Sequence, residues 1–309
     1  MKILVTGGAG FIGSMLIPEL LKFKHDVRVI DNLMYGPEPL LENFFNNKFD
    51  FILGDATSSK DMHKAIENID MVIHLAAIVG YPACKKFPDL AESVNFKSTE
   101  LLCNLLNKKT PIIFGSTGSN YGAITNEICT EKTPLNPLSL YGETKTRAEA
   151  LIHNRGNSVC YRFATAYGVS RRMRLDLLIN DFVFQAVKNK NLTIYEKTFK
   201  RTFIHVRDIV SSFIFAIDNF EKLKNEIYNV GSDKQNLSKQ DIAEILEKKI
   251  NFYLHYAEIG KDEDQRNYEV SYEKIKSMGF IPQISIDQGI DELIKATNLL
   301  NIFNKYSNI

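Results

Sequence analysis

Tyr141 and Lys145 lie four positions apart in the stretch Tyr-Gly-Glu-Thr-Lys, and both side chains can take part in acid/base chemistry. On a helix, this spacing places the two side chains on one face, about one turn apart. A free phenol has a pKa of ~10, and a neighbouring ammonium group favours its ionised form. The pair therefore predicts a general base for a hydroxyl group. Because the same spacing is common on solvated helix faces, this interpretation depends on the rest of the chain.

Three glycines at three-residue intervals, Gly7, Gly10 and Gly13, follow a short apolar run at the start of the chain. The pattern predicts a buried strand before the glycines, a helix after them and a second strand that ends at Asp31. Glycines permit a tight turn in which the backbone approaches a pyrophosphate, while the helix N-terminus faces its negative charge. With the acid eighteen residues beyond Gly13, this arrangement indicates a dinucleotide-binding unit rather than an unrelated glycine-rich turn.

Asp31 predicts which dinucleotide is bound. A carboxylate at this strand end accepts hydrogen bonds from the ribose hydroxyls and repels a 2′-phosphate. Residues 32–35 contain no Arg or Lys that would bind such a phosphate. The sequence therefore favours NAD over NADP.

Strand and helix patterns alternate along the chain, which indicates a fold of the α/β class. This fold must hold Tyr141, Lys145 and the glycine turn in place. We expect a Rossmann-type doubly wound parallel sheet with a smaller mixed α/β substrate-binding domain. The NAD-binding domain is expected at 1–165 plus 205–235 and the second domain at 166–204 plus 236–309, with the ligand in the cleft between them. Strands are expected at 1–6, 26–30, 49–53, 71–75, 111–115, 159–163, 227–230 and 252–256, and helices at about 14–23, 58–67, 90–107, 139–153, 177–187 and 238–248.

Composition restricts the class of protein further. The formal net charge of the 309 residues is +1, which gives no reason to expect nucleic acid or a membrane as a partner. The four cysteines form no Cys-x-x-Cys pair and the six histidines are scattered, so we expect reduced thiols and no metal site. No apolar run approaches ~18 residues, and the first one is too short for a signal peptide. These features predict a cytoplasmic protein.

Several stretches match those of one family in the same order along the chain. They are Thr6–Gly13, Asp31–Leu33, Gly54–Asp55, His74–Ala77, Ser116–Gly122, Tyr141–Lys145, Arg201–Ile209 and Tyr228–Gly231. With these stretches the chain resembles the extended short-chain dehydrogenases/reductases, in their nucleotide-sugar epimerase and dehydratase branch. The stretch Arg172–Phe182 also resembles a bacterial subgroup that modifies nucleotide-linked sugars for surface polysaccharides and includes GDP-heptose 4-dehydrogenases.

The resemblance implies a role for the matching residues. Tyr141 would take a proton from a sugar hydroxyl while the same carbon passes a hydride to the nicotinamide. Lys145 would hold the nicotinamide ribose and lower the pKa of Tyr141, and Thr117 would hydrogen-bond the reacting oxygen. NAD would be held by Gly7, Gly10, Phe11, Ile12, Gly13, Asp31, Asn32, Asp55, Ala56, Leu75, Ala76 and Ala77, together with Tyr141 and Lys145.

The resemblance also implies residues that bind the nucleotide sugar. Arg201 and Arg266 match arginines that bind its diphosphate, because a guanidinium suits phosphate oxygens. Thr165 stands where the family has an Asn that contacts the sugar. Arg174 and Asn180 are expected near the substrate, although the basic cluster around Arg174 is equally well explained as a solvated face.

Departures from the family pattern restrict the reaction. The 4,6-dehydratases carry carboxylates just after the catalytic Thr, where this chain has Gly118 and Ser119, and the 3,5-epimerising relatives carry a Cys in this segment. Cys84 is expected to be a nearby thiol and His205 a structural residue. Among the reactions of this family, these departures leave the oxidation of a nucleotide-diphosphate sugar at C4. Either a 4-epimerase or a 4-dehydrogenase carries out such an oxidation. A non-catalytic NAD-binding regulator is disfavoured by the intact catalytic set, and an NADP-dependent carbonyl reductase by Asp31.

Relatives of this family form a homodimer through a four-helix interface. The helices expected at 90–107 and 139–153 are the corresponding ones, so a homodimer is expected. Their apolar stripes are equally well explained by packing on the sheet.

Overall fold

The computed structural model describes residues 1–260, 266–300 and 306–308. Its centre is a seven-stranded sheet of order β11-β7-β5-β4-β1-β2-β3, in which every neighbouring pair is parallel. The predicted Rossmann-type doubly wound sheet is therefore confirmed. The strands are β1 (Lys2–Thr6), β2 (Asp26–Asp31), β3 (Phe49–Leu53), β4 (Met71–His74), β5 (Ile112–Thr117), β7 (Ser158–Phe163) and β11 (Glu226–Val230).

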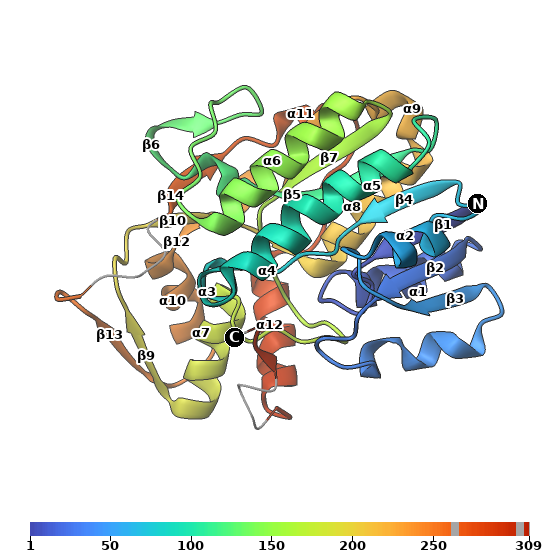
Figure 1. Ribbon diagram of the computed structural model, residues 1–309. Coiled ribbons are helices and arrows are strands. Elements are labelled where there is room, and N and C mark those ends of the chain that lie inside the picture. Colours follow the sequence, from blue (N-terminus) through green and yellow to red (C-terminus); the bar gives the residue numbers. More distant parts are fainter. Residues whose placement is uncertain (261–265, 301–305, 309) are drawn as a thin grey trace.

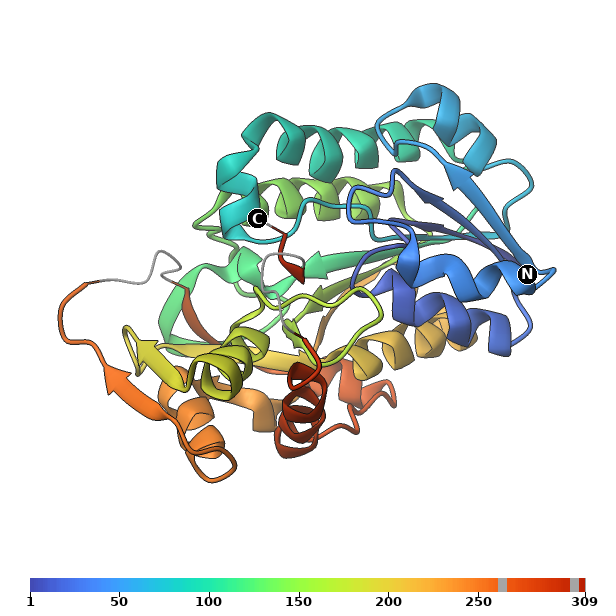
Figure 2. The same ribbon diagram turned by 90° about the horizontal axis from the view of Figure 1, so that it is seen from below.

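Helices cover both faces of this sheet, and Figure 2 shows the resulting three layers. Side chains alternate along β1: Ile3 and Val5 belong to the apolar cluster on one face, and Leu4 belongs to the cluster on the other. Both faces are apolar because helices cover both, as is typical of parallel sheets. The first face is covered by α1 (Gly13–Lys22) and α8 (Val206–Asp218), and the second by α2 (Ser59–Ala65), α5 (Ser98–Leu105) and α6 (Leu140–Arg155).

A third hydrophobic cluster, apart from the two on the faces of the sheet, is built from residues 167–203, 242–246 and 290–293. It holds together α7 (Leu178–Phe184), α10 (Lys239–Glu247) and α12 (Ile286–Thr297), which lie beside one another below the sheet in Figure 1. Small sheets flank it: β8 (Thr165–Tyr167), β10 (Lys200–His205) and β12 (Asn236–Ser238) form one, and β9 (Asn191–Ile194) pairs with β13 (Tyr253–Tyr256). A further pair joins β6 (Ala123–Cys129) to β14 (Asn267–Val270).

The remaining elements are short. They are α3 (Tyr81–Lys86), α4 (Pro88–Glu92), α9 (Phe220–Leu223) and α11 (Glu273–Ser277), with 3-10 turns at η1 (Glu38–Phe45), η3 (Gly118–Tyr121) and η5 (Asp233–Gln235). Among the described helices, none is long and apolar enough to cross a membrane.

Two predicted helices differ from the observed ones. The helix expected at 90–107 is α4 followed by a π-helical turn, η2 (Ser93–Lys97), and then α5, and the helix expected at 177–187 likewise ends in a π-helical turn, η4 (Gln185–Asn189). In η2 the side chain of Asn95 hydrogen-bonds the backbone of Ile78 through both of its polar atoms. The wider turn thus places the buried amide of Asn95 against the loop after β4. The spacing of apolar residues in the sequence does not indicate such a contact between distant segments.

Candidate active site

A cavity of about 750 Å³ opens at the carboxyl ends of β1, β4 and β5, between the sheet and the third hydrophobic cluster. Its walls come from the glycine turn after β1, the loop after β4, the end of β5 and the first turn of α6, and from α7 and β9 on the other side. In the sheet, β2 and β3 follow β1 on one side, whereas β4 pairs with β1 on its other side. The order of the strands therefore reverses at β1. This reversal of strand order is where open parallel sheets bind their ligands.

The glycine turn packs directly on the loop after β4. Gly7 has a φ of +70°, and a Cβ atom built there would lie 2.8 Å from the backbone of Ala76. A Cβ on Gly13 would lie 2.6 Å from the Cα of Gly8. The backbone therefore comes close to the cavity at the N-terminus of α1, where its amides can face a pyrophosphate. All of the predicted cofactor residues line the cavity, including Phe11, Ile12, Asn32, Ala56, Leu75 and Ala77.

Asp31 ties the glycine turn to the loop after β2. Its Oδ2 accepts a hydrogen bond from the backbone N–H of Ala9 at 2.9 Å, and its Oδ1 accepts one from that of Leu33 at 2.8 Å. Burial raises the pKa of Asp31, and these two hydrogen bonds oppose the shift. Each carboxylate oxygen keeps a second lone pair for a ribose hydroxyl. The carboxylate of Asp55 accepts hydrogen bonds within its own turn, from the backbone and hydroxyl of Thr57. Together the glycine cradle and Asp31 fit a dinucleotide.

Helix α6 carries Tyr141 and Lys145 into the cavity wall. It begins after Ser139, whose hydroxyl accepts a hydrogen bond from the N–H of Gly142 at 3.2 Å. The Nζ atom of Lys145 lies 4.0 Å from the centre of the Phe114 ring, and burial lowers the pKa of this lysine to about 7.

The pKa of Tyr141 differs from the sequence expectation. Burial raises it to about 12, and a hydrogen bond with Thr117 and the charges of Arg174 and Arg266 oppose the shift. The ammonium group of Lys145 lies 4.0 Å from the centre of the Phe114 ring. The lowering of the Tyr141 pKa by Lys145 and a bound nicotinamide stays a prediction. Without a cofactor, the charges of Arg174 and Arg266 act to lower the pKa of the phenol.

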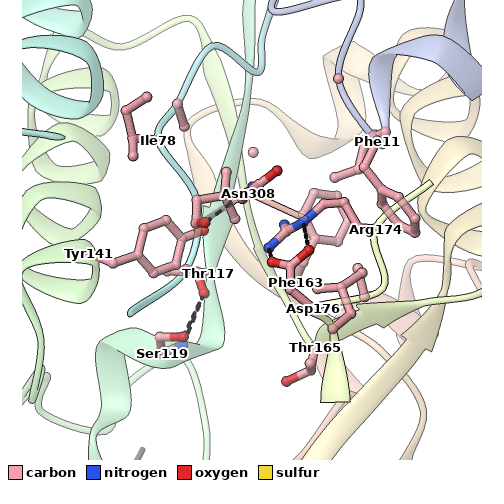
Figure 3. A pocket seen from close by; sticks show the side chains of 18 of the residues that line it. Phe11, Ile78, Thr117, Ser119, Tyr141, Phe163, Thr165, Arg174, Asp176 and Asn308 are labelled. Atoms are coloured by element: carbon pink, nitrogen blue, oxygen red, sulfur yellow. Dashed lines mark hydrogen bonds and ion pairs between the residues drawn. The ribbon is translucent and has the colours of Figure 1, made fainter. Parts of the chain in front are cut away.

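Thr117 begins a chain of hydroxyl groups at the end of β5. Its hydroxyl donates to the Oγ atom of Ser119 at 3.1 Å, and Ser119 also accepts a hydrogen bond from the guanidinium of Arg266. Figure 3 shows Tyr141, Thr117 and Ser119 together on one side of the cavity. In the sequence, Ser119 stands out only as the position of a missing carboxylate, and the resemblance implies that Arg266 binds a diphosphate. In the structure, Arg266 contacts the group that orients Thr117.

The other predicted substrate residues are only partly brought together. Arg174, Arg201 and Thr165 line the cavity, and both arginines are buried. The guanidinium of Arg174 forms an ion pair with Asp176 at 2.6 Å. Asn180 does not line the cavity. Its amide is fully used by hydrogen bonds to the backbone of Gly168 and to the carbonyl of Arg174, so it supports the loop from inside.

Cys84 and His205 lie outside the reacting cluster. The thiol of Cys84 is buried and donates to the carbonyl of Ile78 at 3.3 Å, and burial raises its pKa to about 11. His205 accepts a hydrogen bond from the N–H of Arg207 and begins α8. Within the described parts of the chain, no group of three or more His, Cys, Asp or Glu residues could hold a metal ion.

Some lining residues carry no signal in the sequence. Tyr35 faces Arg172, whose guanidinium lies 4.0 Å from the ring centre, and Asn308 reaches the cavity from the far end of the described chain. Both are placed by tertiary packing, and neither belongs to a motif with its own periodicity. Composition and spacing therefore could not have found them.

On this Rossmann-type fold, a dinucleotide cradle adjoins a cluster of Thr117, Tyr141 and Lys145, an arrangement that fits a dinucleotide-dependent enzyme. The sequence model of the NAD dependent epimerase/dehydratase family matches residues 3–231, and the chain belongs to this family. Its cofactor is NAD, as predicted.

Individual relatives differ in the reaction that their names give. The chain is 29% identical to a UDP-glucose 4-epimerase of Lactobacillus helveticus, over 75% of this chain and 77% of that one. It is also 29% identical to a UDP-N-acetyl-alpha-D-glucosaminuronate decarboxylase of Bacillus cytotoxicus, over 95% and 97% of the two chains. The crystal structure of a UDP-glucuronic acid 4-epimerase of Bacillus cereus with UDP-glucuronic acid and NAD superposes with a TM-score of 0.87. It is 28% identical, and the match covers 97% of this chain and all of that one.

Proposed function

We propose that this protein is an NAD-dependent 4-epimerase that acts on a nucleotide-diphosphate sugar, with UDP as the first nucleotide to test. The observation that carries the proposal is the cluster of Tyr141, Thr117 and Lys145 on the cavity wall, with no carboxylate at Gly118 or Ser119. In this proposal the part at 1–165 plus 205–235 holds the cofactor, and the part at 166–204 plus 236–309 holds the sugar nucleotide. The relatives named as UDP-sugar 4-epimerases support UDP.

Tyr141 removes the proton from the C4 hydroxyl, and Thr117 holds the same oxygen by a hydrogen bond. Bound NAD supplies the acceptor for the hydride that leaves C4. Arg174 and Arg266 stabilise the phenolate by their charge, since both already oppose the rise in the pKa of Tyr141. In the structure the hydroxyl of Thr117 donates to Ser119. A hydroxyl has one proton to donate, so this hydroxyl turns from Ser119 to the C4 oxygen when the sugar is bound.

The fate of the ketone separates an epimerase from a 4-dehydrogenase. In an epimerase the 4-keto sugar turns over in the cavity and is reduced from its other face. In a dehydrogenase it leaves, and the reduced cofactor needs a second oxidant. The stretch Arg172–Phe182 supports the second candidate and a GDP-linked sugar in polysaccharide synthesis, through its resemblance to GDP-heptose 4-dehydrogenases. Elimination of water is disfavoured, because a 4,6-dehydratase needs an acid/base where Gly118 and Ser119 stand.

Turnover of UDP-, GDP-, dTDP- and CDP-hexoses, with products separated by ion-exchange chromatography and identified by mass spectrometry, tests the proposal. An epimerase gives a product of unchanged mass, and a dehydrogenase gives one that is two hydrogens lighter. We expect Tyr141→Phe to lower turnover by at least ~10²-fold without lowering the NAD content. Tyr253→Phe serves as the matched control because that ring is 67% exposed. Full activity of Tyr141→Phe would refute the proposed base.

A homodimer through α5 and α6 is part of the same proposal. The two helices lie side by side across one face of the sheet in Figure 1, so a second copy can complete a four-helix contact. Light scattering after size-exclusion chromatography measures the mass, and a monomer at micromolar concentration would contradict this part alone.

A further inference from the structure

Residues 306–308 form a short segment that lies against the cavity. The N–H of Leu175 donates to the carbonyl of Tyr306 at 2.8 Å, and the guanidinium of Arg172 donates to the carbonyl of Ser307 at 3.3 Å. Figure 2 shows this short segment, next to the label C, in the middle of the molecule and apart from α12. The two hydrogen bonds fix the segment to the wall that leads into α7.

Asn308 joins this segment to the opposite wall. Its Nδ2 donates to the carbonyl of Val79, in the loop after β4, at 3.3 Å. The side chain is 9% exposed and lines the cavity. Its Oδ1 is buried and has no hydrogen-bond partner among the described residues. Buried amide oxygens are nearly always paired, so this acceptor indicates a donor that arrives with a ligand.

The position of Asn308 shows which end of the cavity it faces. Gly80, next to its partner Val79, lies beside Arg174, since a Cβ built on that glycine would be 3.5 Å from Nη2 of the arginine. In the view of Figure 3, Asn308 lies between Tyr141 and Arg174. The acceptor is therefore at the reacting end, away from the adenosine end that Asp31 marks.

We propose that Asn308 is a substrate-binding residue whose Oδ1 accepts a hydrogen bond from a hydroxyl of the bound sugar. This inference rests on the proposed function. A diphosphate has no donor to offer at neutral pH. The nicotinamide nucleotide offers its carboxamide and two ribose hydroxyls, whereas a hexose presents a larger number of hydroxyl donors. With sugar bound, Asn308 links it to Val79, and the segment 306–308 spans the sugar end of the cavity.

The test compares the affinity for a nucleotide sugar with that for its nucleoside diphosphate in a Tyr141→Phe background, which prevents turnover. Isothermal titration with UDP-glucose and UDP, or with the pair that the wild type accepts, is made on Asn308→Ala and on Asn308→Leu, which keeps the side-chain volume. Asn298→Ala is the control, because that asparagine is exposed at the end of α12. We expect both Asn308 variants to bind the nucleotide sugar roughly three- to tenfold more weakly, with unchanged affinity for the diphosphate and unchanged NAD content.

Each other result overturns the inference. An equal loss for the nucleotide sugar and the diphosphate would mean that Asn308 only supports the cavity wall. A loss of NAD would mean that the acceptor serves the carboxamide or the ribose of the nicotinamide nucleotide. A wild-type protein that binds no nucleotide sugar overturns the proposed function as well, whereas unchanged sugar affinity in the variants overturns this inference alone.

Discussion

The Nζ atom of Lys145 lies 4.0 Å from the centre of the Phe114 ring, so the amine that the sequence pairs with Tyr141 rests against an apolar side chain. Burial lowers its pKa to about 7, and the charge of Glu149 opposes this shift. At neutral pH, the amine is thus close to the point where it loses its proton.

Lys145 should make the stability of the protein depend on pH. Its pKa is about 7 in the folded protein and near 10.5 when unfolded. Because the unfolded chain holds more protons between these values, the cost of the buried ammonium is full below pH 7 and disappears as the pH rises to 10.5. We expect Lys145→Met to be more stable than wild type at pH 6, with a gap that narrows by up to about 1.4 kcal/mol per pH unit above pH 7. Urea unfolding of both proteins from pH 6 to 10 measures this, and a constant gap would contradict it.

His74 should contribute to loss of stability in acid. Burial and the charge of Lys145 lower its pKa to about 3, and its ring bonds the hydroxyls of Thr6 at 2.7 Å and Thr99 at 3.0 Å. Its ordinary pKa is ~6.5, so this stability is present above pH 6.5 and is lost as the pH falls toward 3.

The replacement His74→Gln isolates this contribution. We expect the variant to be less stable than wild type at pH 7, where the ring's hydrogen bonds are lost. From pH 6.5 to 5 it should lose about 2 kcal/mol less than wild type. Parallel acid-dependent unfolding curves for the two proteins would show that His74 titrates normally.

Gly13 and Gly10 provide a matched pair. A Cβ on Gly13 would lie 2.6 Å from the backbone of Gly8, whereas a Cβ on Gly10 would come no closer than 3.2 Å to the carbonyl of Gly7. We expect Gly13→Ala to destabilise the protein by about 1–3 kcal/mol and to release NAD, and Gly10→Ala to weaken NAD binding with a smaller loss of stability. Thermal unfolding with and without NAD distinguishes them, and equal losses of stability would contradict the packing argument.

Asp31 should determine the choice of cofactor. In Asp31→Asn the charge that repels a 2′-phosphate is gone, while one oxygen remains to accept a backbone hydrogen bond. We expect the ratio of NADP to NAD affinity to rise about tenfold, equivalent to ~1.4 kcal/mol. Titration of the two cofactors measures the ratio, with Asp26→Asn, exposed at the start of the same strand, as the control. An unchanged ratio would assign the selection to another residue.

The sequence predicted the features that depend on local pattern. The strands of the central sheet are apolar runs, and β3 has the predicted bounds of 49–53. The glycine turn and Asp31 were found because their chemistry needs residues close in sequence. The pair β6 and β14 was not predicted, because its strands are far apart in the chain and neither is a continuous apolar run.

The sequence also did not predict which groups the side chains of Lys145 and Asn180 contact. Spacing put Lys145 and Tyr141 on one helix face, but only the packed structure shows that Phe114 receives the ammonium group. Asn180 was predicted near the substrate because it belongs to the stretch Arg172–Phe182. In the structure its amide hydrogen-bonds the backbone of Gly168 and of Arg174. These contacts join distant segments, and no local pattern encodes them.

Strand β11 completes the central sheet beside β7, although residues 164–225 lie between them in the chain. During synthesis, β7 therefore emerges from the ribosome well before its neighbour. At ~5–20 residues per second, the intervening segment takes ~3–12 s to make. For that time β7, all of whose residues are buried in the finished protein, presents an open apolar edge of the kind that aggregates. A fragment that ends at residue 165 would keep that edge permanently, so we expect such a fragment to aggregate.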